Sequence, residues 1–504
     1  MSRERPLLIL LMLVYAALGS LFAILTPAWQ IPDEPAHYNY ARQLAEHRRC
    51  CPIIEPGDWD QTYLEQLKAA RFAPDLLDNL EAIQYEDHQP PLYYQVVSLV
   101  YGWFGDGLIA MRLISVLFGA GVVLCTYALA RALLPDRPGA ALGAAAFVAF
   151  LPQHVAMIAA VNNDSLVELL IGAVLLITTY FLLGQTTRNR WLGVRFLITA
   201  LLGLTVLLVA RRIPSSVGAG FLALIAVGAL VPSISRTKGW QIWMLGVLVG
   251  LIFTTKATGY FLAALVPLAI LLRYRGTFRA IRRWDTLYLR MLGIKLMYFL
   301  IPALILGGLW WLRNFSTYGF PDFLGLRMHD LVVADQLRTA DFIAASGSGV
   351  YLNEWVWTTF RSFWGQFGWM ALPLQGGMYS VFLGLTLFAV IGLLIDRLVL
   401  PRRTFRRETA RRRRMVWIIL GLTLALTFLA YVYYNSVFVQ FQGRYLYPAL
   451  IPIALLLALG IDAWRRWVLP GALWAQWLPL AVFGLLAPLD LYLLLRVIRP
   501  LLLP

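Results

Sequence analysis

The chain has 504 residues, of which 60% are hydrophobic and only 14% are charged, and its mean hydropathy is +0.68. Because a soluble domain carries about 25% charged residues, this composition excludes a soluble globular protein and predicts an all-α polytopic membrane protein. The net charge of +16 is concentrated in loops between apolar segments. That placement is typical of membrane topology and argues against nucleic-acid binding.

The first apolar segment runs from Leu7 to Leu25 after a short basic start. It is longer than the apolar region of about 7–15 residues that a cleaved signal peptide uses, and it is long enough to cross a bilayer. We therefore predict a retained signal anchor with its N-terminus in the cytoplasm.

Twelve further apolar segments follow, which together predict a bundle of about thirteen transmembrane helices. The thirteen predicted spans are residues 7–25, 108–133, 139–159, 165–184, 192–209, 213–231, 240–255, 258–272, 292–312, 375–396, 415–434, 445–463 and 477–495. The segment 240–272 is too long to cross once, so a tight hairpin is expected at "KATG".

With the N-terminus inside, the two most basic loops, Arg273–Arg290 and Asp396–Arg414, both fall on the cytoplasmic side. These loops can also contact anionic membrane lipids. Two long segments then face outward, 26–107 with amphipathic helices and 313–374 with many aromatic residues. We expect one transmembrane domain over residues 1–504 in the plasma (inner) membrane, with its chemistry on the outer face.

The chain has three cysteines, an odd number, so no disulfide framework is implied. Cys125 lies within an apolar span, where packing is its expected role. Cys50 and Cys51 are adjacent, and because a disulfide between neighbours forms a strained ring, free thiols are the preferred interpretation.

Ionisable residues divide along the chain at the outer helix ends. Acidic residues, with one histidine, lie near the early spans: Asp33, Glu34, Glu86, Asp87, His88 and Asp164. Basic residues lie near the later spans: Arg211, Arg212, Lys256, Arg313 and Arg444. If the bundle closes, carboxylates that can accept a proton or hold a metal face cations that can bind phosphate.

Each of these residues also has an ordinary interpretation. An Asp-Glu pair in a loop is commonly solvated, a basic residue at a span end commonly extends to lipid headgroups, and "NND" at 162–164 can cap a helix. No zinc-protease, Walker A or nucleophile-elbow motif occurs in the sequence. The pattern predicts a phosphate-binding site with a base, but it does not name a substrate.

At these residues the sequence resembles the GT-C superfamily of polytopic glycosyltransferases, in the branch of the protein O-mannosyltransferases and the lipid A aminoarabinose transferase. The matching stretches, in chain order, are "PDEPAHYNYARQLAE" after the first span, "EDHQPPLYY", "NNDS", "TKATG", "WLRNFSTYG" and "QGRYLYPAL". The resemblance implies a GT-C-like fold and transfer of a sugar from a polyprenyl-phosphate donor. The acceptor, which can be a lipid, a glycan or a protein, stays open.

The resemblance also implies roles for individual residues. Asp33 matches the catalytic carboxylate that deprotonates the acceptor hydroxyl or amine, and Glu34 is the second acid of that motif. The donor phosphate is expected to be held by Lys256, Arg313, Arg444, Tyr445 and His88. In some members a divalent metal ion binds at the positions of Glu86, His88 and Asp164, and here the metal requirement stays open because Glu86 is offset.

Two other function classes remain alternatives. A transporter or flippase of a lipid-linked sugar would place its site near the bilayer midplane on broken helices. A non-catalytic scaffold would not need acidic and basic residues segregated at the outer helix ends. The concentration of charge at helix ends favours the enzyme.

Overall fold

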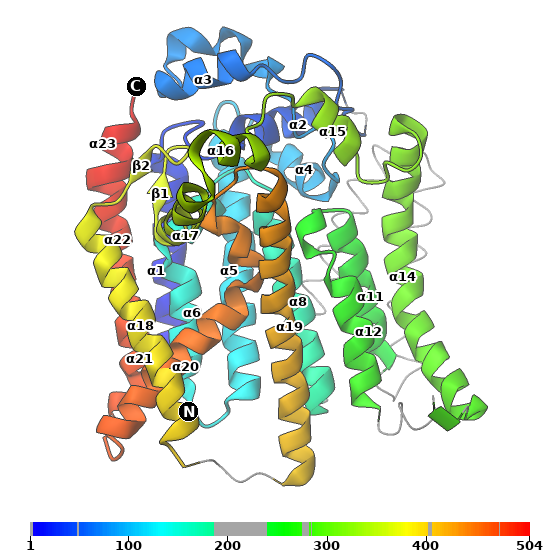
Figure 1. Cartoon of the computed structure of the whole chain (residues 1–504), viewed down its shortest axis with the longest axis vertical. Helices are drawn as coiled ribbons and strands as arrows, with labels where there is room; N and C mark the ends of the chain where they lie inside the picture. The colour runs from blue at the N-terminus through cyan, green and yellow to red at the C-terminus, as the bar shows by residue number, and fades with distance from the viewer. Residues whose placement is uncertain are drawn as a thin grey trace.

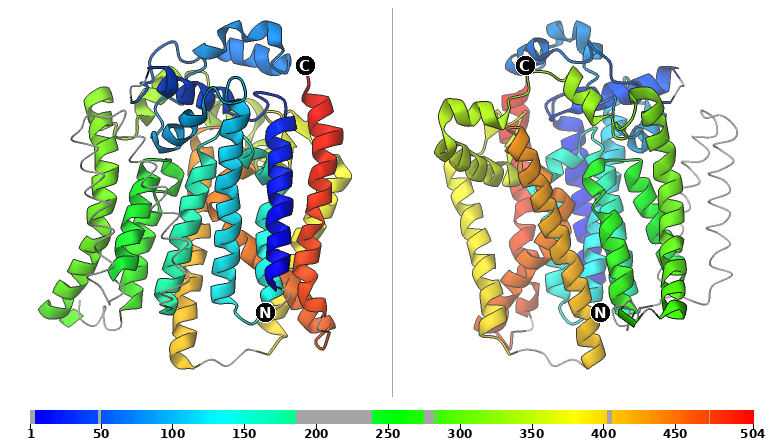
Figure 2. Two further views of the ribbon diagram at one scale, coloured as in Figure 1. Left: turned by 180° about the vertical axis from the view of Figure 1, so that it is seen from behind. Right: turned by 45° about the vertical axis from the view of Figure 1, so that its right-hand side comes forward.

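The computed structural model describes residues 4–47, 50–185, 239–274, 282–283, 285–401, 406–472 and 474–504. In this part of the chain long helices form an upright bundle, and short helices cover one end of it, here called the covered end (Figure 1). The N-terminus lies at the opposite end, and the views in Figure 2 show the same arrangement. The described fold is helical apart from one antiparallel pair of two-residue strands, β1 (Gln366–Phe367) and β2 (Leu372–Pro373). This confirms the predicted all-α fold class.

Eight described helical segments are long and apolar enough to cross a membrane, and a ninth is formed if one bent helix pair counts as a span. The first part of the chain supplies α1 (Glu4–Leu25), α5 (Leu108–Leu133), the bent pair α6 (Pro138–Phe150) and α7 (Pro152–Ile158), and α8 (Asp164–Leu183). The protein is therefore an integral multi-pass membrane protein, as its composition predicts.

The second part of the chain completes the bundle. Its long helices are α14 (Thr286–Tyr318), α18 (Gly376–Leu398), α19 (Arg407–Val437) and α20 (Leu450–Val468), the last of which follows the 3-10 turn η4 (Gly443–Ala449). A broken last span comprises η5 (Trp474–Trp477), α21 (Leu478–Gly484), α22 (Leu486–Leu493), the π-helical turn η6 (Leu494–Ile498) and α23 (Arg499–Leu502). The predicted spans 192–209 and 213–231 lie outside the described residues.

The expected hairpin within 240–272 is confirmed. Helix α11 (Gly239–Phe253) ends before the 3-10 turn η3 (Ala257–Gly259), and α12 (Leu262–Arg273) follows. Both helices are shorter than a typical membrane span, and they lie side by side against α14 and α8 (Figure 1). The turn between them carries Lys256, whose side chain is only 16% exposed.

Two segments form the cover. The first, between α1 and α5, contains α2 (Glu34–His47), α3 (Gln61–Ala69), η1 (Pro74–Ala82), α4 (Leu92–Val97) and η2 (Ser98–Val100). The second, after α14, contains α15 (Leu326–Val332), α16 (Thr339–Ser346) and α17 (Ser348–Trp364). These correspond to the two long segments, 26–107 and 313–374, that are predicted from the sequence to face outward.

Helix α6 lies inside the bundle because its side chains are small. Its sequence, "PGAALGAAAFVAF", is almost wholly buried, and the helix packs against α1, α5, α20 and α21. A methyl group on Gly139 would come within 1.6 Å of the carbonyl oxygen of Gln476, so the backbones approach closely there. Small residues permit this kind of packing between membrane helices, where burial of apolar surface supplies no drive.

Candidate active site

Asp33 lies at the junction between the first span and the cover. Its backbone is left-handed, with φ of 69°, a conformation that aspartate tolerates better than most residues. The carbonyl oxygen of Asp33 accepts a hydrogen bond from the amide of His37 at 3.1 Å, so Asp33 is the residue that immediately precedes α2. A carboxylate at this position is stabilised by the partial positive charge of a helix N-terminus.

The side chain of Asp33 forms an ion pair with Arg444, which lies 411 positions later in the sequence. Arg444 Nη2 is 2.6 Å from Asp33 Oδ2, and the Tyr85 hydroxyl donates to Asp33 Oδ1 at 3.0 Å. Burial acts most strongly and raises the pKa of Asp33, but Arg444 and the two hydrogen bonds outweigh it and lower the pKa to about 2. Asp33 is therefore ionised and held by its partner.

Arg444 is fixed by a close approach of η4 to α17. The amide of Gly443 donates to Ser362 Oγ at 2.8 Å, and a methyl group on Gly443 would lie 2.4 Å from the amide nitrogen of Phe363. Only glycine fits this contact. Arg444 Nε also donates to Gln442 Oε1 at 2.6 Å, and its guanidinium lies over the ring of Tyr445, 5.4 Å from the centroid.

A second ion pair joins Asp164 to Lys256. Lys256 Nζ is 2.7 Å from Asp164 Oδ1. Asp164 opens α8, and its amide donates to Asn162 Oδ1 at 2.8 Å, whereas Asn163, the residue directly before the helix, makes no side-chain capping hydrogen bond. Lys256 follows α11, where the carbonyl of Thr254 accepts from the amide of Leu92 in the "PPLYY" stretch.

Two further titratable groups lie among these ion pairs. Burial and the charge of Lys256 lower the pKa of His37 to about 3, which leaves the imidazole neutral, and its Nδ1 lies 2.8 Å from the Tyr94 hydroxyl. Glu86 interacts with both Asp33 and Lys256. These six residues, here called the charged cluster, are Asp33, His37, Glu86, Asp164, Lys256 and Arg444.

Glu86 should make stability depend on pH. Burial and the neighbouring Asp33 raise its pKa from 4.5 to about 7, so the folded protein holds this proton more tightly than the unfolded chain does. The stabilisation is present below pH 4.5 and is lost as pH rises through 7. We expect thermal unfolding in detergent to show that the Tm of wild type falls relative to Glu86→Gln over this range. Parallel Tm curves would contradict the assignment.

Glu34 lies outside the charged cluster although it adjoins Asp33. It is fully buried, and its two carboxylate oxygens lie 2.7 Å from Nε and 2.6 Å from Nη2 of Arg112. The amides of Trp29 and Val161 donate to the same carboxylate, each at 3.1 Å. Arg112 also donates to the carbonyls of three residues around the end of α1: Ala23, Thr26 and Pro27. This network fixes the backbone that leads to Asp33.

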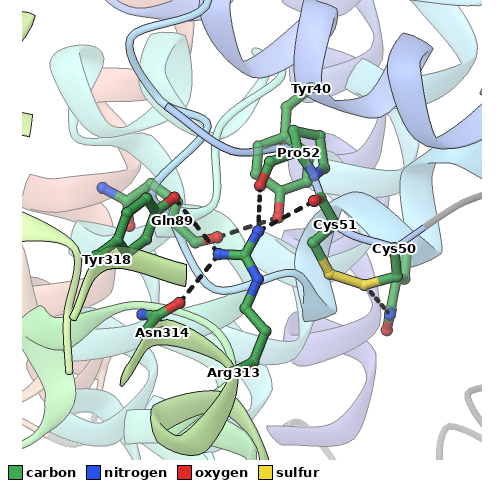
Figure 3. The surroundings of a disulfide bond; sticks show 9 residues. Tyr40, Cys50, Cys51, Pro52, Gln89, Arg313, Asn314 and Tyr318 are labelled. Carbon is green, nitrogen blue, oxygen red and sulfur yellow. Dashed lines mark hydrogen bonds between the residues drawn. A yellow bond between two sulfur atoms is a disulfide. The ribbon is translucent and has the colours of Figure 1, made fainter. Parts of the chain in front are cut away.

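Arg313 is also held by structural contacts, shown in Figure 3. Its Nη2 donates to the carbonyls of Cys51 at 3.0 Å and Pro52 at 2.6 Å. Cys50 and Cys51 are joined by a disulfide, so the expectation of free thiols is wrong. The adjacency of the two cysteines in the sequence does not show how their sulfurs come together. In the structure Arg313, which lies in α14, donates a hydrogen bond to the backbone carbonyl of Cys51.

His88 contacts the second covering segment. Its ring lies 4.4 Å from that of His329 in α15, and its Nδ1 is 3.1 Å from the carbonyl of Tyr85. Burial, followed by the neighbouring His329, holds the pKa of His88 well below its usual value, so the ring is neutral. His88 thus lies beside the charged cluster and joins the two covering segments.

Residues 88–227 match the family model described as dolichyl-phosphate-mannose-protein mannosyltransferase. This match confirms the predicted resemblance to the GT-C glycosyltransferases. Two solved structures of ArnT from Cupriavidus metallidurans are also similar to this chain. The apo state has 15% identity and a TM-score of 0.46, and the state bound to undecaprenyl phosphate has 16% and 0.45. Each alignment covers 98% of this chain and 73% of that chain. No curated protein sequence matches.

The metal site that the GT-C resemblance implies is not supported by the geometry. Among the described residues, no three His, Cys, Asp or Glu side chains come together in a way that could hold a metal ion. Asp164 pairs with Lys256, and His88 faces His329 rather than Glu86. Of the three expected ligands, Glu86 and Asp164 both interact with Lys256, whereas His88 packs against His329.

Three further residues shape this site and were not predicted from the sequence: Arg112, His37 and Tyr85. The position of Arg112 could have indicated its role, because an arginine inside a predicted transmembrane span needs a partner. The position of His37 could also have done so, since it lies one helical turn after Asp33. Nothing in the sequence around Tyr85 indicates its role. Arg211 and Arg212 lie outside the described residues.

Proposed function

We propose that this chain transfers a sugar from a polyprenyl-phosphate donor to a hydroxyl or amine of an acceptor at the covered end of the bundle, on the outer face of the membrane. The family match indicates a membrane glycosyltransferase, and the donor class rests on the resemblance. The observation that carries the proposal is the Asp33–Arg444 ion pair at the covered end, which places a carboxylate that can act as a base next to a guanidinium that can bind phosphate.

In the proposed reaction, the donor phosphate competes with Asp33 for Arg444. A guanidinium forms two parallel hydrogen bonds with a phosphate, and Lys256 can add a point charge. Once Arg444 turns to the phosphate, Asp33 loses the interaction that holds its pKa near 2 and becomes a stronger base. The base is thus released only when a donor is bound.

The chemical step then follows. Asp33 accepts the proton of the acceptor hydroxyl or amine as that atom forms a bond to the anomeric carbon. The bond between the anomeric carbon and the phosphate oxygen breaks, and its electron pair leaves on the polyprenyl phosphate. Arg444 and Lys256 stabilise this leaving charge, and such electrostatic stabilisation is commonly the largest contribution to catalysis. Glu34, locked to Arg112, acts in this proposal as a positioning residue rather than as a contact to the acceptor.

Buried polar atoms of Glu86 in the charged cluster and of sequence neighbours of that cluster suit a sugar. Asn162 Nδ2, Asn163 Oδ1, Glu86 Oε2 and Asp87 Oδ1 have no hydrogen-bond partner within the described part of the chain. Burying such atoms unpaired costs about 1–3 kcal/mol each, which a ligand with several hydroxyl groups can recover.

Replacing either cation should weaken donor binding. For Arg444→Gln and Lys256→Gln we expect the Kd for polyprenyl phosphate to rise about 10–100-fold each, because a hydrogen bond to a charged group is worth about 1.5–3 kcal/mol. Binding can be measured by thermophoresis in detergent. Arg327→Gln, an exposed arginine on α15 in the cover, is the matched control. Unchanged binding in both cluster variants would remove them from the phosphate site.

The transporter alternative has one observation in its favour. His154 Nε2 lies 2.8 Å from Glu168 Oε2 within the spanning helices α7 and α8, and ionisable pairs at this depth often mark transport paths. Purified protein in liposomes, supplied with a panel of polyprenyl-phosphate sugars, separates the two functions. Mass spectrometry should show donor consumption and a glycosylated acceptor. Movement of a donor across the bilayer without consumption would favour transport.

A further inference from the structure

A cavity of about 460 Å³ lies at the end of the bundle opposite the charged cluster. It is formed by the C-terminal ends of α5, α18 and α20 and by the first turns of α19, which all meet at this level (Figure 1). No residue of the proposed glycosyltransferase site lines it, so its function has to be considered separately.

Basic side chains dominate the cavity wall. Five arginines line it, namely Arg137, Arg397, Arg413, Arg414 and Arg466, against two carboxylates, Asp136 and Asp396. Such an excess of positive charge in a concave site attracts anions.

Two of these arginines are already neutralised by carboxylates. Arg137 lies 3.7 Å from Asp396 and 3.6 Å from the buried Asp462, and Arg466 also pairs with both carboxylates. Arg397 and Arg414 are exposed, and within the described ranges neither forms an ion pair. These two guanidinium groups are therefore available to a ligand.

The remainder of the wall is apolar. Leu133, Leu459 and Trp417 line the same cavity as the arginines. Next to it, Leu398 and Val468 expose 77% and 61% of their surface at the helix ends, where a lipid bilayer would cover them. A tryptophan beside arginines is the usual arrangement at a membrane–water interface. A free inorganic anion would use the arginines but would leave the apolar wall without a partner.

We propose that this cavity binds the headgroup phosphate of an anionic phospholipid from the leaflet at this end of the bundle. Arg397 and Arg414 would hold the phosphodiester, while the first carbons of the acyl chains lie against Trp417 and Leu459. Lipid binding at this site would make the packing of α18, α19 and α20 depend on the lipid composition of that leaflet. The inference does not depend on the proposed sugar transfer.

Native mass spectrometry of the full-length protein in detergent tests this site. Titration with phosphatidylglycerol should give a saturable one-lipid complex that phosphatidylcholine does not form at the same concentration. In the double variant Arg397→Gln/Arg414→Gln, the Kd for phosphatidylglycerol should rise about 25-fold, since each arginine near an anionic headgroup contributes a factor of about five.

The matched control is Arg283→Gln/Arg290→Gln, which removes two exposed arginines that do not line the cavity and should leave the Kd unchanged. A further measurement adds millimolar inorganic phosphate as a competitor, which should not displace the bound lipid. Equal binding of phosphatidylcholine, an unchanged Kd in the cavity variant, or displacement of the lipid by inorganic phosphate alone would each overturn the proposal.

Discussion

The substitution Asp33→Asn is expected to reduce sugar transfer by about 10²–10⁴-fold, the usual contribution of a positioned general base. Asparagine keeps the shape of the side chain and can still accept the hydrogen bond from Tyr85, but it cannot take the acceptor's proton. Because Arg444 then loses its carboxylate partner, donor binding should be unchanged or tighter. The defect would therefore appear in kcat and not in KM.

The measurement is single-turnover transfer in liposomes, with Kd for the polyprenyl-phosphate donor determined in parallel. Asp75→Asn, an exposed aspartate of the same covering segment, serves as the control and should behave like wild type. A near wild-type rate for Asp33→Asn would exclude this carboxylate as the base. Weaker donor binding in the same variant would instead show that Asp33 and the phosphate do not compete for Arg444.

The substitution Arg112→Leu is expected to destabilise the fold by about 3–5 kcal/mol, because it leaves the Glu34 carboxylate buried without its counter-charge. Both side chains of this pair are 2% exposed or less, so solvent cannot compensate the charge. The variant also removes the donor from three carbonyls at the end of α1. Its unfolding can be followed by denaturant titration of the protein in mixed micelles.

The double variant Arg112→Leu/Glu34→Gln tests whether buried charge is the cause. Glutamine carries no charge that needs a partner, and its single carbonyl oxygen can still accept a hydrogen bond from one of the two amides, that of Trp29 or that of Val161. We expect the double variant to recover part of the lost stability. If it is as unstable as Arg112→Leu alone, the lost carbonyl contacts, and not the charge, explain the effect.

The spans could be predicted from the sequence because apolar runs of about twenty residues have no other stable place in a membrane protein. The predicted span 108–133 coincides with α5, and the break at "KATG" follows from a length that one crossing cannot hold. The covering helices were predicted only in part, because whether a short amphipathic segment forms a helix depends on the elements that it packs against.

The site was harder to predict than the fold. Helix-end placement was enough to single out Asp33, Lys256 and Arg444, but the pairing of Asp33 with Arg444 connects distant segments and has no local signal. Glu34 shows the limit most clearly. Side by side in sequence, Asp33 and Glu34 read as one acidic motif, yet the left-handed backbone at Asp33 sends one carboxylate to the charged cluster and leaves the other buried.

The ion pair between Asp33 and Arg444 also has a consequence for biosynthesis. Asp33 follows the first membrane helix, whereas Arg444 precedes the last two long helical segments. During translation Asp33 is synthesised early, and Arg444 follows only after most of the remaining chain has been made. Until those late helices insert, the nascent protein lacks the cation that pairs with Asp33, so the proposed sugar transfer requires a nearly complete chain.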